Sequence, residues 1–224
     1  PTSRDSVLKN GTEVGELARN LFGDYTNIEF NKDLNIMIAE TRKLLKNKPN
    51  IITEASFNYD NNFCSVDILK NNLDGMEIYE VKSSTEVQDI YLDDASYQYF
   101  VLSNLGLNVK KVCIVYINNQ YIRGKKLEIE KLFNIEDITD IAKSKQDEIR
   151  KNIEITNKYM NEHDKNNEPK EDIGMKCLKP YKCEFWEYCT RNLPRPNVFD
   201  IGGGMHNSKK FEKYYEGKIS FKDL

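Results

Sequence analysis

Apolar residues recur at intervals of three and four along several stretches of the chain, and this spacing predicts amphipathic helices. The helices are expected over residues 13–22, 35–45 and 91–105, followed by a long charged helix from 137 to about 160. Thr12 fits the N-cap of the first helix and Gly23 fits its end. The polar residues 1–9 before it are expected to be loose.

Runs of β-branched and aromatic residues lie between the helical stretches and predict strands. The strands are expected over residues 51–59, 64–69, 76–84 and 110–117. Asn118 and Asn119 are expected to turn the last strand back into residues 120–123. Helical and extended patterns therefore alternate along the chain, and they predict an α/β fold.

The strands at 64–69 and 76–84 are separated by a polar turn that ends in Asp-Gly, a sequence typical of a β-hairpin. If the hairpin is symmetric about Leu73 and Asp74, a residue on the first strand faces a definite partner on the second. The side chains of directly opposed residues have Cβ atoms about 4.5–5.5 Å apart. The position of the turn therefore predicts which polar side chains meet.

Two carboxylates and one ammonium group are expected to meet in this hairpin. Asp67 lies across from Glu80, and Lys82 shares a face with Glu80 because side chains alternate along a strand. Two facing carboxylates repel each other, and a divalent cation between them would remove the repulsion. An amphipathic hairpin with an ordinary salt bridge is the alternative interpretation.

Asp67 followed by Glu80-Val81-Lys82 resembles the aspartate and Glu-x-Lys signature of the PD-(D/E)XK, or restriction-endonuclease-like, nuclease superfamily. The chain is most similar to RecB-type exonucleases and their CRISPR-associated iron–sulfur relatives. Residues 10–195 also resemble the N-terminal nuclease-like part of an uncharacterised bacterial family. The resemblance implies a restriction-endonuclease-like core, with a central mixed β-sheet flanked by helices and a C-terminal cysteine-bearing cap.

The same resemblance implies divalent-metal-dependent hydrolysis of phosphodiester bonds in single- or double-stranded DNA. Asp67 and Glu80 would bind Mg²⁺ or Mn²⁺, and the carbonyl group of Val81 would be a further ligand. Lys82 would orient or activate the attacking water molecule. A non-catalytic nucleic-acid-binding or scaffold module that keeps the nuclease fold is the alternative.

Four further residues are candidates for this site. Gln98 occupies the position of a glutamine that faces the active site in RecB-like nucleases, although Leu102 stands where those enzymes have a tyrosine. Glu54 is on the strand expected next to Asp67, where it could approach the metal or be a solvated edge residue. Relatives often have a further acidic ligand on the first helix, and here either Glu13 or Glu16 could match it. Both glutamates could equally serve to stabilise the helix N-terminus.

Cys177, Cys183 and Cys189 form a second cluster, with five residues between successive members. Thiolates in such a tract suit zinc or an iron–sulfur cluster. The RecB-like resemblance implies a [4Fe–4S] cluster whose fourth cysteine precedes the nuclease core. No cysteine precedes Cys64, so the cluster is expected to be incomplete in this chain. His206 is an alternative ligand for zinc, and a cysteine-based metal or redox module is a third interpretation of the protein.

The composition suits one globular domain with an appendage: of 224 residues, 39% are hydrophobic and 31% are charged. The formal net charge of −3 gives no overall attraction to nucleic acid, so DNA binding would need a local basic patch. No apolar run approaches the ~18–20 residues of a membrane helix. With no signal peptide, the five cysteines indicate a reducing, cytoplasmic location, where Cys64 and Cys113 are expected to be core residues.

Three segments are expected along the chain. Residues 1–160 would form the nuclease-like core, 161–195 the cysteine-cluster segment, and 196–224 a tail or a linker to a further domain. The first residue, Pro1, indicates a piece of a longer chain. A further domain of that chain is therefore an expected partner beside DNA, whereas a membrane is not.

Overall fold

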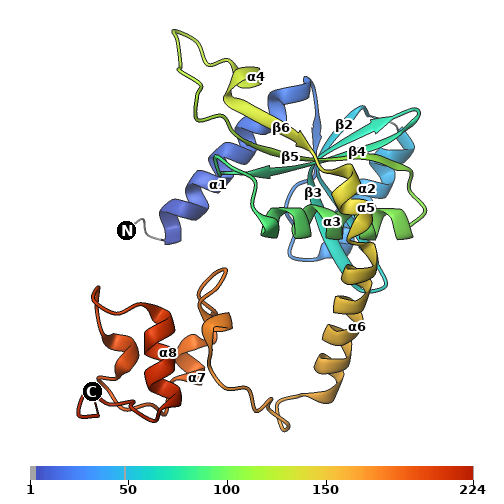
Figure 1. Cartoon of the computed structure of the whole chain (residues 1–224). Coiled ribbons are helices and arrows are strands. Elements are labelled where there is room, and N and C mark those ends of the chain that lie inside the picture. The colour runs from blue at the N-terminus through green and yellow to red at the C-terminus, as the bar shows by residue number, and fades with distance from the viewer. Residues whose placement is uncertain (1–3, 48, 224) are drawn as a thin grey trace. The chain divides into compact units, whose positions relative to one another are not determined.

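The computed structural model describes residues 4–47 and 49–223, and the chain divides into two compact units, Pro1–Lys158 and Tyr159–Leu224 (Figure 1). The first unit contains α1 (Arg4–Ala18), η1 (Arg19–Phe22), β1 (Thr26–Asn27), α2 (Leu34–Asn47), β2 (Ile51–Tyr59), β3 (Asn62–Asn72), β4 (Gly75–Lys82), α3 (Asp89–Asn104), β5 (Val109–Ile117), α4 (Ile129–Leu132), β6 (Phe133–Asp137) and α5 (Thr139–Ser144). Helix α6 (Gln146–Glu162) follows. The second unit contains η2 (Met175–Cys177), α7 (Trp186–Cys189), η3 (Val198–Asp200) and α8 (Asn207–Tyr215).

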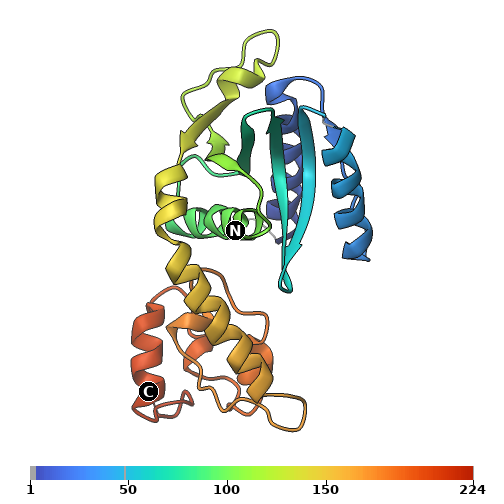
Figure 2. The ribbon, with the colours of Figure 1, turned by 90° about the vertical axis from the view of Figure 1, so that its right-hand side faces the viewer.

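The first unit is an α/β structure with a six-stranded mixed sheet in the order β1-β2-β3-β4-β5-β6. The pairs β1–β2 and β4–β5 are parallel, and the other three pairs are antiparallel. Strands β2, β3 and β4 run side by side, with α2 next to them (Figure 2). The predicted mixed sheet flanked by helices is confirmed.

Each face of the sheet has its own apolar core. One core joins Ile52, Val66 and Ile78 to residues of α2, α3 and α5, such as Met37, Val101 and Ala142. The other core joins Ile68, Tyr79 and Val115 to the stripe of Val14, Leu17 and Leu21 at the C-terminal part of α1 and in η1. Cys64 and Cys113 are buried in these two cores, as expected. The sheet is therefore held from both sides, and α3 is fixed against the face that carries Ile78.

The first helix is longer than the sequence pattern predicts. It begins at Arg4, so residues 4–9 are helical and Thr12 lies inside the helix instead of capping it. The stretch contains no proline, and a glycine in a helix costs only about 1 kcal/mol relative to alanine, so Gly11 does not end it. The predicted end is right, because Gly23 follows η1 with φ of 91°. Residues 1–3 of the expected loose segment lie outside the described residues.

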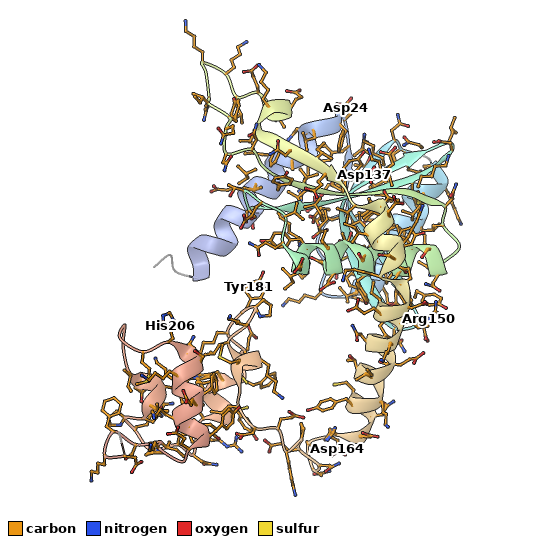
Figure 3. All side chains as sticks on the ribbon, viewed as in Figure 1. Asp24, Asp137, Arg150, Asp164, Tyr181 and His206 are labelled. Carbon is orange, nitrogen blue, oxygen red and sulfur yellow. The ribbon has the colours of Figure 1, made fainter. Side chains whose placement is uncertain are left out.

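The partner of β5 is β6, not residues 120–123. Ile122 is 89% exposed, whereas Phe133 is buried, so the later segment is the one that contributes an apolar side chain to the sheet. The predicted long helix is correspondingly divided. Strand β6 ends at Asp137 (Figure 3), and two helices, α5 and α6, follow.

The second unit has a small aromatic core. Ile173, Trp186 and Phe211 are buried there, and Phe199 and Tyr214 pack against them. Trp186 and Phe199 meet edge to face, with their ring centroids 5.2 Å apart. The cysteine segment and the tail, which the sequence separates at residue 195, thus share one core.

Candidate active site

The β3–β4 hairpin has the register that its turn predicts. Ile68 pairs with Tyr79 and Leu69 with Ile78, and one further step of this register brings Asp67 to Glu80. Gly75 ends the turn with φ of 149°, and a Cβ atom there would lie 2.9 Å from the backbone oxygen of Asn108. Because only glycine fits this position readily, the turn and the register are fixed by local sequence.

Glu80 is buried, at 6% exposure, and both of its carboxylate oxygens have partners. Gln98 Nε2 donates a hydrogen bond to Oε2 at 2.5 Å, and Lys82 Nζ lies 2.7 Å from Oε1. Gln98 reaches the sheet from α3 and is itself only 3% exposed. Among the described residues its Oε1 is a buried oxygen without a hydrogen-bond partner. An oxygen in that state is suited to accept a hydrogen bond from a ligand or bound water.

Asp67 lies beside this group and is half-buried. Its Oδ2 accepts a hydrogen bond from the backbone N–H of Val81 at 2.7 Å. Burial raises the pKa of Asp67 to about 6, against the opposing effect of that N–H. Burial also raises the pKa of Glu80 well above its usual value, and the charge of Asp67 adds to the effect. The charge of Asp67 therefore disfavours the charged form of Glu80, and the charges of Glu54 and Asp94 disfavour the charged form of Asp67.

Lys82 is held by two carboxylates. Its Nζ lies 2.7 Å from Glu80 Oε1 and 2.5 Å from Asp94 Oδ2, and it is 5.3 Å from the ring centroid of Tyr91. Burial alone would lower the pKa of Lys82, but the charges of Glu80 and Asp94 hold it above its usual value. The lysine is therefore an ammonium ion that partly neutralises three carboxylates.

Glu54 occupies the strand position opposite Asp67. The β2–β3 pairs on either side are Thr53 with Ile68 and Ala55 with Val66. Glu54 has a positive φ of 57°, a conformation that costs about 1–2 kcal/mol for a residue with a side chain. Its negative charge contributes to the raised pKa of Asp67. Strained residues of this kind cluster at functional sites, which supports Glu54 as a member of this one.

Arg19 in η1 forms an ion pair with Glu54 of β2. The distance from Arg19 Nη2 to Glu54 Oε1 is 2.9 Å, and Ser65 Oγ lies 3.4 Å from Oε2. Glu54 is therefore engaged by a cation of the protein itself. The side chains of Glu13 and Glu16 are exposed on α1. In the described part of the chain, no hydrogen bond or ion pair joins the Glu16 carboxylate to Asp67 or Glu80, and the acidic ligand expected from the first helix stays a prediction.

The donors fit a divalent cation with few protein ligands. Within residues 4–47 and 49–223, no group of three or more histidine, cysteine, aspartate or glutamate side chains is arranged to hold a metal ion. Mg²⁺ usually keeps several water molecules and is bound through one or two carboxylates. Asp67 and Glu80 supply two, and the unpartnered Oε1 belongs to the same Gln98 amide group whose Nε2 donates to Glu80. The amide N–H of Val81 donates a hydrogen bond to Asp67. The carbonyl oxygen of Val81 is the remaining metal ligand that the sequence resemblance implies.

The three cysteines of the second unit are not gathered into a metal-binding group in the described residues. Cys177 ends η2, Cys183 follows, and the backbone N–H of Cys183 donates to the Cys177 carbonyl oxygen at 2.8 Å. Cys189 is exposed at the end of α7, and all three thiols are free. His206, the suggested alternative ligand, is the N-cap residue of α8 (Figure 3).

Two residues of this site are missed by sequence reasoning. Asp94 lies one helical turn before Gln98 and so shares its face, but the sequence does not indicate that it would reach Lys82. Arg19 comes from a segment far from Glu54 in the sequence, and nothing in the local pattern singles it out. Pairing between distant segments is the information that a single sequence lacks.

Comparison of the chain with models of protein families finds no match, and comparisons with curated proteins and with solved structures find none either. None of the helices described is both long and apolar enough to cross a membrane.

Proposed function

We propose that the chain is a Mg²⁺- or Mn²⁺-dependent nuclease that hydrolyses phosphodiester bonds of DNA, with a restriction-endonuclease-like core. The observation that carries the proposal is the environment of Glu80. A buried carboxylate is fixed by Gln98 and Lys82 and lies next to a second carboxylate, Asp67. The two carboxylates put an excess of negative charge in an environment of low dielectric constant. This arrangement is stable only if a cation or bound protons offset the charge.

Each group in the site has a role in this proposal. Asp67 and Glu80 would hold the metal ion, with the Val81 carbonyl as a further ligand. The bound metal supplies Lewis-acid stabilisation of the phosphate and lowers the pKa of a water molecule. Gln98 fixes the Glu80 carboxylate through its Nε2. Lys82, an ammonium ion, offsets the negative charge that develops on the phosphate oxygens during attack.

The iron–sulfur cluster implied by the sequence resemblance does not enter the proposed reaction. A [4Fe–4S] cluster is held by four thiolates, whereas the cysteine-bearing unit offers Cys177, Cys183 and Cys189. Because these thiols are not gathered in the described residues, the cluster stays a prediction from the resemblance. The cytoplasmic location and a further domain are likewise predictions that the proposed reaction does not need.

The test is cleavage of end-labelled single-stranded DNA, double-stranded DNA and RNA, with Mg²⁺ or Mn²⁺ and with a chelator. Asp67→Ala and Lys82→Ala are expected to lose cleavage while remaining folded. The matched controls are Asp74→Ala and Lys110→Ala, which break an exposed ion pair of 2.7 Å at the turn of the same hairpin. Both controls are expected to cleave like the parent chain.

Two outcomes would overturn the proposal. Cleavage that persists in both site variants would place the activity elsewhere. A parent chain that binds DNA but never cleaves it, with either metal, would favour the non-catalytic binding module. The second result would leave the carboxylate pair without a catalytic role.

A further inference from the structure

Lys82 bridges two carboxylates that differ in their access to solvent. The Glu80 side chain is 8% exposed and the Asp94 side chain is 46% exposed, and both lie within 2.7 Å of Lys82 Nζ. The inner carboxylate is the one assigned to the metal ion. The outer carboxylate has no role so far.

One face of α3 holds both members of the Glu-x-Lys pair. Tyr91, Asp94 and Gln98 are spaced by three and four residues, so they lie along one side of the helix. Gln98 contacts Glu80, Asp94 contacts Lys82, and the ring of Tyr91 lies near the lysine Nζ. The position of the lysine is therefore set by α3 as well as by its own strand.

An ammonium group and a divalent cation compete for the same carboxylate. When the Glu80 oxygens bind a doubly charged cation, the ion pair between Glu80 and Lys82 weakens and the two cations repel each other. A lysine with no other partner would then move into solvent. Asp94 gives the ammonium group a second partner and keeps it beside the site.

We propose that Asp94 is a positioning residue, which retains the Lys82 ammonium group when Glu80 binds a divalent cation and thereby strengthens cation binding. The inference rests on the proposed function for the presence of the metal ion. It goes further by giving a role to a residue outside the sequence signature. Asp94 acts through Lys82, without touching the metal or the substrate.

The test is a double-mutant cycle on the binding of Mn²⁺ alone, measured by titration calorimetry without DNA. Asp94→Asn is expected to weaken Mn²⁺ binding about tenfold, because Lys82 then has only Glu80 as a partner. Lys82→Met is expected to tighten binding, because it removes the competing ammonium group. In the Lys82→Met background, Asp94→Asn is expected to change the affinity less than about threefold, since exposed charges are screened by salt.

Three controls accompany the cycle. Asp93→Asn removes the same charge from the neighbouring position, where the carboxylate lies 2.8 Å from Lys145 Nζ, and it is expected to bind Mn²⁺ like the parent chain. Asp94→Glu keeps an acceptor for Lys82 and is expected to restore most of the affinity. Thermal unfolding without metal shows which variants are folded. If Asp94→Asn is not folded, Lys82→Met still tests the premise, because Mn²⁺ binding that is not tighter than in the parent chain would show that Lys82 does not compete with the cation and would overturn the proposal.

Each result has a definite meaning. Equal losses for Asp94→Asn in both backgrounds would show a general effect of charge and overturn the proposal, as would unchanged affinity in the parent background. A parent chain that binds no Mn²⁺ and cleaves no nucleic acid would overturn the proposed function together with this inference. If the parent chain binds Mn²⁺ and cleaves while the cycle is additive, only the role of Asp94 fails.

Discussion

Two lysine–glutamate pairs lie on the β3–β4 hairpin, one on each face of the sheet, and they differ in charge balance. Near the turn, Lys70 lies 3.8 Å from Glu77, whose carboxylate also accepts hydrogen bonds from Asn72 and Tyr79. Lys70 also lies 3.6 Å from the ring centroid of Phe22. One ammonium group therefore faces one carboxylate, and neutral donors satisfy the carboxylate further. The charges of Lys70 and Glu77 are therefore balanced within the pair.

The second pair, Lys82 with Glu80, has the same residue types and a different balance. Asp67 and Asp94 add two carboxylates, so a single ammonium group faces three negative groups. An ion pair between lysine and glutamate therefore does not by itself indicate a functional site. The excess of buried charge that the protein leaves unneutralised is what indicates one.

Exchanging each glutamate for glutamine is expected to give the largest difference in cleavage between the two pairs. Glu80→Gln is expected to lower DNA cleavage by about 10²–10⁴-fold, because several kcal/mol of metal-ion catalysis are lost. Glu77→Gln removes a carboxylate from the same strand on the opposite face of the sheet, and it is expected to leave cleavage within about twofold of the parent chain. Initial rates with Mn²⁺ measure both variants. Comparable losses in the two would show that the pairs do not differ in the way proposed.

Divalent cations are expected to stabilise the protein through one pair only. At a concentration of about 100 times the dissociation constant, Mn²⁺ should add about 2.7 kcal/mol to the free energy of unfolding. For a chain of this size the melting temperature would rise by about 5–10 °C. Asp67→Ala is expected to abolish the rise and Glu77→Gln to keep it, as measured by calorimetry with and without chelator. A rise that survives in Asp67→Ala would place the cation elsewhere.

The pH dependence of stability should show the unneutralised charge directly. The pKa of Asp67 is raised to about 6 by burial, above its unfolded value of 3.8, so the native state binds this proton more tightly than the unfolded state does. Its stabilising contribution is complete below about 3.8 and is lost as the pH rises through about 6. Without metal, the parent chain should therefore lose stability relative to Asp67→Asn between pH 4 and 7.

Urea unfolding of both chains across this pH range measures the effect. Added Mg²⁺ at pH 7 should remove the disadvantage of the parent chain. A constant difference between the two chains from pH 4 to 7 would contradict the assignment. Asp74→Asn is the matched control, because the Asp74 side chain is exposed and its pKa is lowered by Lys110.

The smallest effect is expected at the balanced pair. Lys70→Met should lower the free energy of unfolding by about 1 kcal/mol, because it removes the cation–π contact with Phe22 and a partly exposed ion pair. Cleavage should not change. Urea unfolding and the cleavage assay measure the two quantities, and a loss of cleavage in the folded variant would link the turn end of the hairpin to the site.

The central part of the site could be predicted from sequence because its geometry is local. The Asp-Gly turn fixes the pairing of β3 with β4, and counting along two strands is enough to bring Asp67 to Glu80. Gln98 follows from the resemblance to RecB-like nucleases, which implies a glutamine facing the site on the helix after the Glu-x-Lys strand. The α/β class and the mixed sheet depend on similarly clear patterns.

The rest depends on contacts between distant segments. A turn at Asn118 and Asn119 predicts an immediate return of the chain at residues 120–123, whereas β6, the true partner of β5, comes after a longer loop. Arg19 and Asp94 acquire roles only when η1 and α3 meet the sheet. The arrangement of the three cysteines could not be predicted for the same reason. Regular spacing in the sequence does not ensure that the thiols come together.

Gly75 has a consequence for how sequence change would affect the protein. It touches none of the charged groups of the site, yet a side chain there would collide with the backbone of Asn108. A slip of the turn by one residue would carry Asp67 to the opposite face of the sheet. In a library of random substitutions, this glycine is expected to tolerate as little change as the carboxylates, and a screen for inactive variants would group it with the proposed site residues.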